Sequence, residues 1–516
     1  MPAALAPRPK RLTPLPALGL RHRHIYILMI LFAVALRWAY FGDPAPDYDE
    51  QIYRLIGEQM LDGRLPYVDI WDRKPIGLFL IYAAASLAGA GSVLAYQLLA
   101  CAAAALGGIL LFHLARHFID VLGACVCGIL YILFLSAFGV HVGQSEVYYI
   151  PLLIAMALLT VRTAESNDLH AVRRASTWAI VLGGLALQIK YTVLPQCVFF
   201  GLCALWRQWR LGSSLSALAR QALLYAAIGL TPTVIVLGLY WYLSHLDAFL
   251  FANFTSIFFR GHLSGAMKDE YRIRIAFMAF PLAFCALFGV AQWMMEKMAA
   301  RSSYLIMLGW LASSIAGFLM IGNIYIHYFA PVIPAILAVA APTMGMSRVG
   351  AVLTSITFLI GLALFDPISG YYISQRNRIG FQQAASAAAP YVGKNSDCLY
   401  VFDGPTSLYE ATRSCLPTIY VYPDHLSNAM EEHAIGVNTV AEVSRILRNQ
   451  PSVIITASRP IVPHYNAATA QLINQATSRN YVRIGAFQYY PRLLYVNVRR
   501  DLLEQYRSRE KPVSHL

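Results

Sequence analysis

Charged residues are scarce in this sequence. Asp, Glu, Lys and Arg make up only 13% of its 516 residues, about half the share found in an ordinary soluble protein. Hydrophobic residues make up 58%, which is more than a single soluble core requires. They occur in blocks of about 16 to 22 residues, the length of helix that crosses a hydrocarbon core of about 30 Å. The composition therefore excludes one soluble domain and predicts a polytopic α-helical membrane protein.

Acidic residues are also few, 27 against 40 basic ones, and the net charge is +13. A basic excess is one mark of nucleic-acid binding, but these Lys and Arg residues lie mainly in short connections between apolar blocks. Membrane proteins keep such connections in the cytoplasm, so orientation in a bilayer explains the charge and we expect no nucleic-acid partner. The basic connections contain Arg116, Arg162, Arg173, Arg174, Arg207, Arg210, Arg220, Lys297, Arg301 and Arg348.

Eleven membrane spans place all these connections on one side. The chain then begins in the cytoplasm with a basic stretch at residues 1–24, and no small-residue cleavage site follows the first apolar run, which indicates a retained span rather than a signal peptide. The run 76–91 is short and rich in Gly, so we place it in the interface of the outer leaflet. The predicted spans are 25–41, 93–115, 118–140, 147–163, 176–190, 191–206, 221–243, 275–295, 303–321, 326–346 and 349–366.

The C-terminal part, residues 372–516, has a different character from the transmembrane domain predicted over residues 25–371. Its apolar runs shrink to strand length and are rich in Val, Ile and Tyr. Residues 431–450 show helical periodicity between two of these runs. Alternating strands and helices predict a small α/β domain, which the span count places outside the cytoplasm. The predicted strands are 398–404, 418–423, 452–457 and 493–499.

Cysteines are few as well. Six of the eight lie in apolar runs, where we interpret them as small buried hydrophobic residues. Cys398 and Cys415 lie in the polar C-terminal part. If that part is exported, the two are candidates for a disulfide, and otherwise they are two unpaired thiols.

Acids crowd the start of the loop 42–92, directly after the first span. One interpretation is that they solvate the loop and balance nearby Arg and Lys residues. The other is that a carboxylate held beside the membrane acts as a general base on an acceptor hydroxyl or amine, while its neighbours orient it or hold a cation. Their position at the bilayer favours the second interpretation. The four acids are Asp43, Asp47, Asp49 and Glu50.

Two further features of this loop concern its depth in the membrane. Apolar side chains recur at helical spacing after Glu50, which predicts a short amphipathic helix that lies on the membrane. Arg73 and Lys74 precede Pro75, whose fixed φ stiffens the entry into the run 76–91. Such cations usually anchor a chain to anionic lipid, but beside an acidic cluster they are also suited to hold a phosphate.

The segment 49–83, DEQIYRLIGEQMLDGRLPYVDIWDRKPIGLFLIYA, resembles the first periplasmic loop of the GT-C superfamily of membrane glycosyltransferases. The resemblance is to bacterial family 39 and its relatives, the protein O-mannosyltransferases and lipid A aminoarabinose transferases. These have an Asp-Glu pair after the first span, an amphipathic helix and a Lys-Pro-Pro element, where this chain has Lys74-Pro75-Ile76. Segments 184–200 and 326–341 resemble the family in the same order, so the resemblance covers nearly all of residues 25–366, and the C-terminal part resembles the family's small extracytoplasmic domain.

The resemblance implies a GT-C-type enzyme of a bacterial inner membrane. It would transfer a sugar, with inversion, from a polyprenyl-phosphate donor to a lipid, glycan or protein acceptor of the cell envelope. Asp49 would be the base, and Glu50 and Asp47 would support it or bind a divalent cation, Mg²⁺ or Mn²⁺; no other cofactor is expected. The cations that would hold the donor phosphate are Lys74, Lys190, His327 and, as an alternative, Arg73.

Two other segments contain candidate substrate contacts. The loop 244–274 carries Arg260 and His262 among other charged residues, and it either closes over bound substrate or is simply solvated. Glu146 lies at the mouth of another outer turn, where it is suited to bind sugar hydroxyls.

Two other classes of function compete with the enzyme. A lipid or solute transporter, such as a flippase, has ionisable residues near the centres of its spans and broken helices at the midplane. In this chain the notable charges lie at the outer ends of predicted spans, which favours chemistry at the membrane surface. A membrane scaffold whose C-terminal part binds proteins would not depend on Asp49.

Overall fold

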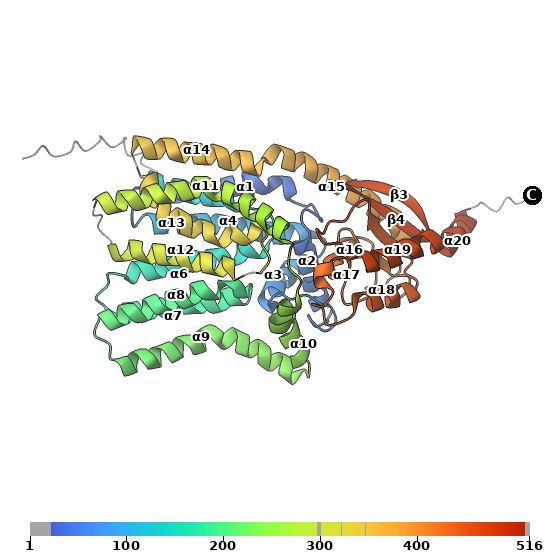
Figure 1. The fold of residues 1–516 in the computed structure, drawn as a ribbon, viewed down its shortest axis with the longest axis horizontal. Helices are drawn as coiled ribbons and strands as arrows, with labels where there is room; N and C mark the ends of the chain where they lie inside the picture. The colour runs from blue at the N-terminus through green and yellow to red at the C-terminus, as the bar shows by residue number, and fades with distance from the viewer. Residues whose placement is uncertain (1–21, 297–300, 321, 346, 511–516) are drawn as a thin grey trace, which may run out of the picture.

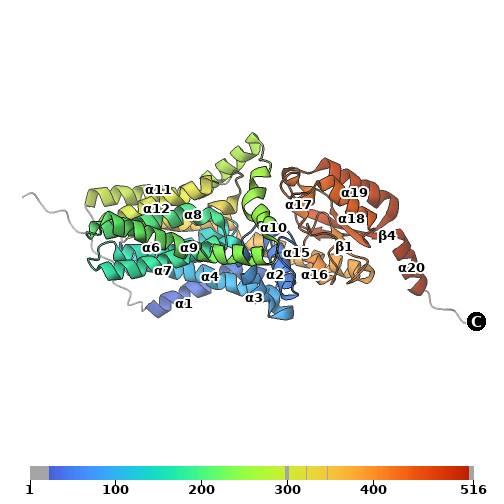
Figure 2. The same ribbon diagram turned by 90° about the horizontal axis from the view of Figure 1, so that it is seen from below.

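The computed structural model describes residues 22–296, 301–320, 322–345 and 347–510. The molecule is elongated, with a bundle of long helices at one end and a small domain that contains a β-sheet at the other (Figures 1 and 2). Short helices of the first loop lie between the two. Of the predicted basic residues, Lys297 and most of the stretch 1–24 lie outside the described range.

Eleven helices of the described residues form the bundle and lie at the eleven predicted spans; α13 is the shortest and continues from a 3-10 helix. Eight segments are long and apolar enough to cross a membrane: His22–Tyr40, Gly89–Ala115, Ser145–Thr163, Leu215–Tyr242, Gly265–Met295, Ser302–Leu319, Ile326–Met344 and Arg348–Tyr391. The prediction of a polytopic helical membrane protein is confirmed. The helices are α1 (His22–Arg37), α4 (Ser92–Ala115), α5 (Val121–Ala137), α6 (Ser145–Thr163), α7 (Leu169–Leu187), α8 (Leu194–Arg210), α9 (Leu215–Tyr242), α11 (Gly265–Glu296), α12 (Arg301–Leu319), α13 (Ile333–Met344) and α14 (Arg348–Phe365).

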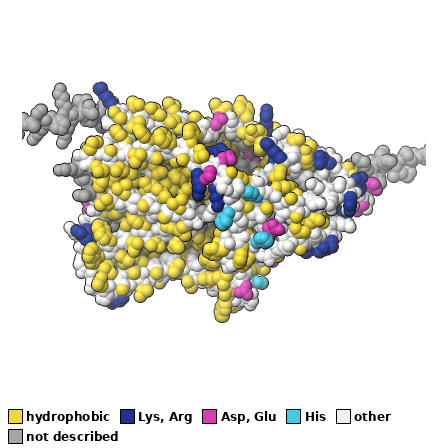
Figure 3. Space-filling view, viewed as in Figure 1, with side chains coloured by type: hydrophobic (Ala, Val, Ile, Leu, Met, Phe, Trp, Pro, Cys, Tyr) yellow, Lys and Arg dark blue, Asp and Glu magenta, His cyan; other side chains and the backbone are white. Residues whose placement is uncertain are grey.

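The predicted cytoplasmic connections meet at the end of the bundle that is far from the sheet (Figure 1). Arg207 at the end of α8 donates a hydrogen bond of 2.5 Å to the carbonyl oxygen of Ser166, between α6 and α7. Arg173 of α7 donates to the side chain of Gln208 at 3.2 Å. Hydrophobic side chains cover the face of the bundle in Figure 3, whereas Lys, Arg, Asp and Glu gather near its ends and on the C-terminal domain. This distribution suits a bilayer around the bundle.

The first loop forms two short helices, α2 (Asp49–Leu61) and α3 (Ile76–Ser86). With 11 residues, α3 is about half the length that crosses a hydrocarbon core, as expected for a helix that does not span. The amphipathic helix predicted after Glu50 is α2, but it does not have one free polar face. Its residues Glu50–Gly57 are buried, because α3 covers one side and the C-terminal domain covers the other.

The loop 244–274 also contains short helical segments. They follow α9 and lead to the start of α11 at Gly265. An exposed patch of large apolar side chains, with Phe258 84% accessible, lies just before Arg260. The segments are α10 (Leu246–Leu250), a π-helical turn η4 (Phe251–Thr255) and a 3-10 helix η5 (Ser256–Phe259).

The C-terminal domain has a four-stranded mixed sheet in the order β1-β2-β4-β3. The first pair, β1 and β2, is parallel, and the other two pairs are antiparallel. A parallel pair needs a long crossover, and here the crossover carries α16 to α18. The strands are β1 (Leu399–Val401), β2 (Val453–Ala457), β3 (Tyr481–Tyr489) and β4 (Arg492–Arg499), and the helices are α15 (Pro367–Ala388), α16 (Leu408–Ala411), α17 (Pro423–Ser427), α18 (Thr439–Arg448), α19 (Ala467–Asn480) and α20 (Arg500–Glu510).

The predicted C-terminal sheet is confirmed in part. Strands expected at 398–404, 452–457 and 493–499 correspond to β1, β2 and β4, but the run 418–423 is not a strand. Its backbone instead pairs with the first loop, where Trp71 N–H donates to the carbonyl oxygen of Ile419 at 3.0 Å. The sequence did not reveal β3, which pairs with β4 at the edge of the sheet.

Long helix α15 connects the bundle to the sheet. The predicted domain boundary at residue 371 lies inside this helix. A Cβ atom at Gly380 would lie 1.7 Å from the carbonyl oxygen of Gln488 in β3, so only glycine allows this close packing. In the same domain Cys398 and Cys415 form a disulfide, with Cα atoms 5.0 Å apart.

Candidate active site

The predicted acidic cluster lies at the start of α2, where the bundle meets the C-terminal domain. Asp49 and Glu50 occupy the first turn of the helix, where the helix dipole favours negative charge. The two side chains differ in access: Asp49 is partly exposed, whereas Glu50 is fully buried. Only a carboxylate that a substrate can reach is able to take its proton, so this difference separates their roles.

Glu50 is held in place by a hydrogen bond inside the protein. Its Oε2 accepts a 2.5 Å hydrogen bond from the backbone N–H of Gly143, and a Cβ atom at position 143 would lie 2.9 Å from the same oxygen. Burial, and then the charge of Asp47, raise the pKa of Glu50 well above its ordinary value. The uncharged form is therefore favoured, and Glu50 holds α2 against the turn that precedes α6.

Asp47 lies just before α2. Its Oδ2 accepts a 2.9 Å hydrogen bond from the side-chain amide of Gln144, and its Oδ1 accepts one of 2.6 Å from the N–H of Tyr48. Burial, and then the negative charge of Asp49, raise the pKa of Asp47 to about 6. Asp47 thus titrates close to neutral pH beside Asp49, and both side chains are half-buried.

Asp49 accepts hydrogen bonds from two tyrosines. Tyr422 of the C-terminal domain donates to Oδ1 at 2.8 Å, and Tyr53, one helical turn along α2, donates to Oδ2 at 3.3 Å. Burial raises the pKa of Asp49, but neighbouring groups outweigh burial and lower the pKa below the ordinary value: the Lys74 ammonium first, then His327, the hydrogen bond from Tyr422, and Lys190. Asp49 is therefore an anion at neutral pH.

Lys74 is the cation with the strongest effect on Asp49. Burial lowers the pKa of Lys74, but Asp49 and Asp72 raise it above its ordinary value, so the ammonium stays charged. Its Nζ lies 5.4 Å from the centre of the Tyr53 ring, and in the described chain it forms no ion pair by distance. The backbone is fixed by a 2.7 Å hydrogen bond from the Tyr67 hydroxyl to the Lys74 carbonyl oxygen. A charged, positioned and unpaired ammonium is suited to meet a phosphate.

Lys190 and His327 lie near Asp49 on other elements of the structure. Lys190 lies in the turn between α7 and the 3-10 helix η3 (Tyr191–Val193). It forms an ion pair with Glu146 of α6, and its Nζ lies 4.4 Å from the centre of the Tyr328 ring. His327 lies in η6 (Ile326–Val332), with its ring 4.6 Å from that of Tyr328. Glu146, proposed from sequence as a sugar contact, is completely buried and faces Lys190.

The three acids of the first loop do not form a ligand set for a metal. Their oxygen atoms face different partners: the Gln144 amide, the Gly143 N–H and the Tyr422 hydroxyl. Within residues 22–510, apart from the gaps given above, there is no group of three or more His, Cys, Asp or Glu side chains that could hold a metal ion. Asp47, Asp49 and Glu50, as they are placed in the described structure, therefore do not fit a divalent cation.

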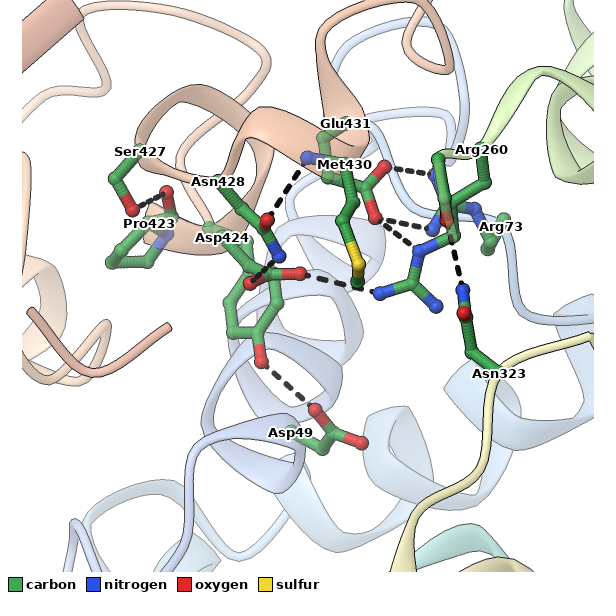
Figure 4. Close-up of polar contacts among 12 residues, drawn as sticks. Asp49, Arg73, Arg260, Asn323, Pro423, Asp424, Ser427, Asn428, Met430 and Glu431 are labelled. Atoms are coloured by element: carbon green, nitrogen blue, oxygen red, sulfur yellow. Dashed lines mark hydrogen bonds and ion pairs between the residues drawn. The ribbon is translucent and has the colours of Figure 1, made fainter. Parts of the chain in front are cut away.

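Arg73 and Arg260 form ion pairs with a residue that the sequence did not suggest as their partner. Both pair with Glu431 of the 3-10 helix η8 (Ala429–Glu431), Arg73 through both of its terminal nitrogens and Arg260 through Nε at 2.6 Å (Figure 4). Arg260 also lies 3.6 Å from Asp424. Burial raises the pKa of Glu431, but Arg73 and Arg260 lower it to about 2. The exposed side chain of His262 is not part of this cluster.

The C-terminal domain contacts the acidic segment directly, which the sequence analysis missed. Arg492 donates a 2.6 Å hydrogen bond to the Tyr48 hydroxyl and forms an ion pair of 2.5 Å with Asp403. Tyr489 donates to the Ala45 carbonyl oxygen at 2.7 Å. No local sequence signal marks Tyr422, Tyr489 and Arg492, because each contacts the acidic segment from more than 350 positions away.

Comparisons with known proteins support the fold. No family model and no curated protein matches the chain. Among solved structures, ArnT from Cupriavidus metallidurans in the apo state is 15% identical, with a TM-score of 0.56 over 92% of this chain and 98% of that chain. The structure of the same protein bound to undecaprenyl phosphate is 12% identical, with a TM-score of 0.52 over 92% and 97%. The chain thus has the GT-C fold that the sequence resemblance implied.

Proposed function

We propose that this protein is a glycosyltransferase that moves a sugar from a polyprenyl-phosphate donor to an acceptor of the cell envelope. The observation that carries the proposal is the arrangement around Asp49, a half-buried carboxylate that neighbouring groups, the Lys74 ammonium foremost, keep ionised. The fold supports it, because a protein of similar structure, ArnT from Cupriavidus metallidurans, is seen bound to undecaprenyl phosphate. A scaffold or transporter has no need of an accessible anion beside an unpaired ammonium.

The proposed reaction is a single displacement. The acceptor hydroxyl or amine gives its proton to the carboxylate of Asp49 as its oxygen or nitrogen bonds to the anomeric carbon of the sugar. The bond between that carbon and the phosphate oxygen breaks with inversion, and the polyprenyl phosphate leaves with the electron pair. Lys74 stabilises the negative charge that grows on the phosphate, because its ammonium is in place before the reaction. Lys190, which pairs with Glu146, contributes further positive charge, and His327 lies beside it as a hydrogen-bond donor.

The experiment is a replacement of Asp49 in a strain that lacks the gene. Mass spectrometry of its membrane lipids should show an accumulated polyprenyl-linked sugar, which the wild-type protein removes. Asp49→Asn keeps the shape of the side chain and both neighbouring hydroxyls but lacks the basic oxygen. We expect it to lower the rate of removal by about 10²-fold to 10⁴-fold, the usual contribution of a general base.

The matched control is Asp269→Asn. Asp269 is an acid of the loop 244–274, 64% exposed and paired only with Arg272 of the same helix, so its replacement should leave removal unchanged. Both variants must reach the membrane at the wild-type level. Full activity of Asp49→Asn, or a deletion strain with an unchanged set of lipid-linked sugars, would contradict the proposal.

A further inference from the structure

Two hydroxyl groups reach Asp49, and they are not equivalent. The Tyr53 hydroxyl comes from α2 itself and lies 3.3 Å from Oδ2. The Tyr422 hydroxyl comes from the other domain and lies 2.8 Å from Oδ1, the length of a good O–H···O hydrogen bond. Burial and the charge of Asp49 raise the pKa of Tyr422 well above its ordinary value, so this hydroxyl keeps the proton that it donates.

The segment that carries Tyr422 is fixed on the first loop at several points. The His425 ring lies 4.6 Å from the Trp71 ring and 5.2 Å from that of Tyr422. Further along, Glu431 is held by Arg73, the residue next to Lys74. In Figure 4 the residues from Pro423 to Glu431 lie on short helical turns, with Arg73 and Arg260 beside Glu431. The hydroxyl of Tyr422 is therefore held in place by contacts on both sides.

We propose that Tyr422 is the positioning residue of the catalytic base: the C-terminal domain supplies the hydroxyl that fixes the orientation of the Asp49 carboxylate. The inference rests on the proposed function and extends it to the C-terminal domain. It also assigns the two carboxylate oxygens. Oδ1 is occupied by the short bond to Tyr422, so Oδ2, with its longer bond to Tyr53, is the oxygen that takes the acceptor proton.

The charged groups around Asp49 do not orient its carboxylate in the way that Tyr422 does. Lys74, Lys190 and His327 act on its charge from the first loop, the α7–η3 turn and η6, and Asp47 acts from the adjacent backbone. None of these four forms a hydrogen bond to Asp49 in the described structure, whereas Tyr422 does. Without the Tyr422 hydroxyl, the carboxylate keeps only the longer hydrogen bond from Tyr53 and is oriented less strictly toward the acceptor.

The test is Tyr422→Phe, which removes one oxygen atom and keeps the ring. The donor is the lipid-linked sugar extracted from the deletion strain, and membranes of that strain provide the acceptor. We expect kcat to fall at least about tenfold, because a hydrogen bond to a charged group is lost. The KM for the donor and the affinity for undecaprenyl phosphate should stay within about twofold, because Tyr422 touches the base and not the phosphate.

The matched control is Tyr420→Phe. Tyr420 lies two residues away, and its hydroxyl donates to the Ile435 carbonyl oxygen at 3.1 Å instead of to Asp49. This variant should retain the wild-type kcat, and both variants should unfold at the wild-type temperature. A Tyr422→Phe enzyme with unchanged kcat would overturn the inference, as would kcat and donor affinity that fall together.

The two proposals fail in distinguishable ways. If Asp49→Asn is inactive but Tyr422→Phe is fully active, Asp49 remains the base and only the role of Tyr422 is lost. If Asp49→Asn is fully active, the proposed chemistry itself is wrong.

Discussion

Lys74 shows how one side chain sets the charge state of the site. Its ammonium is the strongest influence that lowers the pKa of Asp49, and Asp49 is competent as a base only when it is unprotonated. The lowered pKa keeps Asp49 ionised at mildly acidic pH. Removal of the ammonium raises that pKa, so the protonated and inactive form appears at higher pH than in the wild type.

We therefore expect Lys74→Met to change the pH dependence of the reaction as well as its rate. The acid limb of kcat/KM, measured between about pH 4 and pH 8, should move upward by about one unit, the smallest shift typical of a lost opposite charge. The rate above this limb should also fall, because the leaving phosphate loses its cation. Lys394→Met, at an exposed lysine of the C-terminal domain, should keep the wild-type profile. An unmoved acid limb would show that Lys74 does not act on the base.

Individual residues of the site were predictable to different degrees. Asp49 and Lys74 were predicted from local patterns, acids after a span and a Lys-Pro pair, and the structure brings the two close enough for Lys74 to lower the pKa of Asp49. Arg73 was assigned to phosphate by the same reasoning, but its guanidinium pairs with Glu431. The sequence gives no sign of that partner, since it lies 358 positions further along the chain. Tyr422 was missed for the same reason.

At the scale of elements, the connection between η8 and the first loop depends on one carboxylate. The Glu431 side chain is fully buried and faces both Arg73 and Arg260. A buried ion pair contributes little in comparison with an apolar pair, but the loss of one partner leaves uncompensated charge. Here two cations would be left without their carboxylate.

We expect Glu431→Gln to destabilise the contact between the domains by about 3–5 kcal/mol, measured by protease cleavage of the C-terminal domain in detergent. The pKa of Glu431 is lowered to about 2, so its stabilising charge is fully present above its unfolded pKa of about 4.3 and is lost as the pH falls toward about 2. The difference from wild type should thus be constant between about pH 5 and pH 8 and shrink below that. Glu432→Gln, at the neighbouring acid with no ion pair in the described residues, is the control. Equal cleavage of both variants would contradict the role of Glu431.

Hydropathy alone was enough to predict some elements, whereas the structure of others depends on packing against distant segments. All eleven predicted spans are helices, because long apolar runs in a bilayer have no other stable form. The run 418–423 has the composition of a strand, but its neighbour in space is the first loop and not the sheet. Likewise α2 has the periodicity of a surface helix, but the C-terminal domain buries its polar face. Both errors come from contacts between distant segments, which a local pattern does not contain.

At the scale of the whole molecule, the site lies at the end of the bundle that carries the C-terminal domain (Figure 1). The basic connections lie at the other end, so the rule for basic residues assigns the C-terminal domain to the outside. Both the proposed site and the Cys398–Cys415 disulfide suit that compartment.

A fusion to alkaline phosphatase, which is active only outside the cytoplasm, tests this assignment. The full chain fused after Leu516 should show high activity, and a fusion truncated at Gly212, in the connection between α8 and α9, should show almost none. The difference should be at least about tenfold if the basic connections orient the chain. Activity of the Gly212 fusion alone would mean that the orientation is reversed.

The bond between Tyr422 and Asp49 joins residues that are 373 positions apart. At about 5–20 residues per second, a ribosome takes roughly 20 to 75 seconds to travel from one to the other. All the predicted spans, which end at residue 366, are made before that interval is over, but until residue 422 is added the chain lacks the hydroxyl that bonds Asp49. If Tyr422 positions Asp49 as proposed, a chain interrupted before residue 422 has no oriented carboxylate and should be inactive.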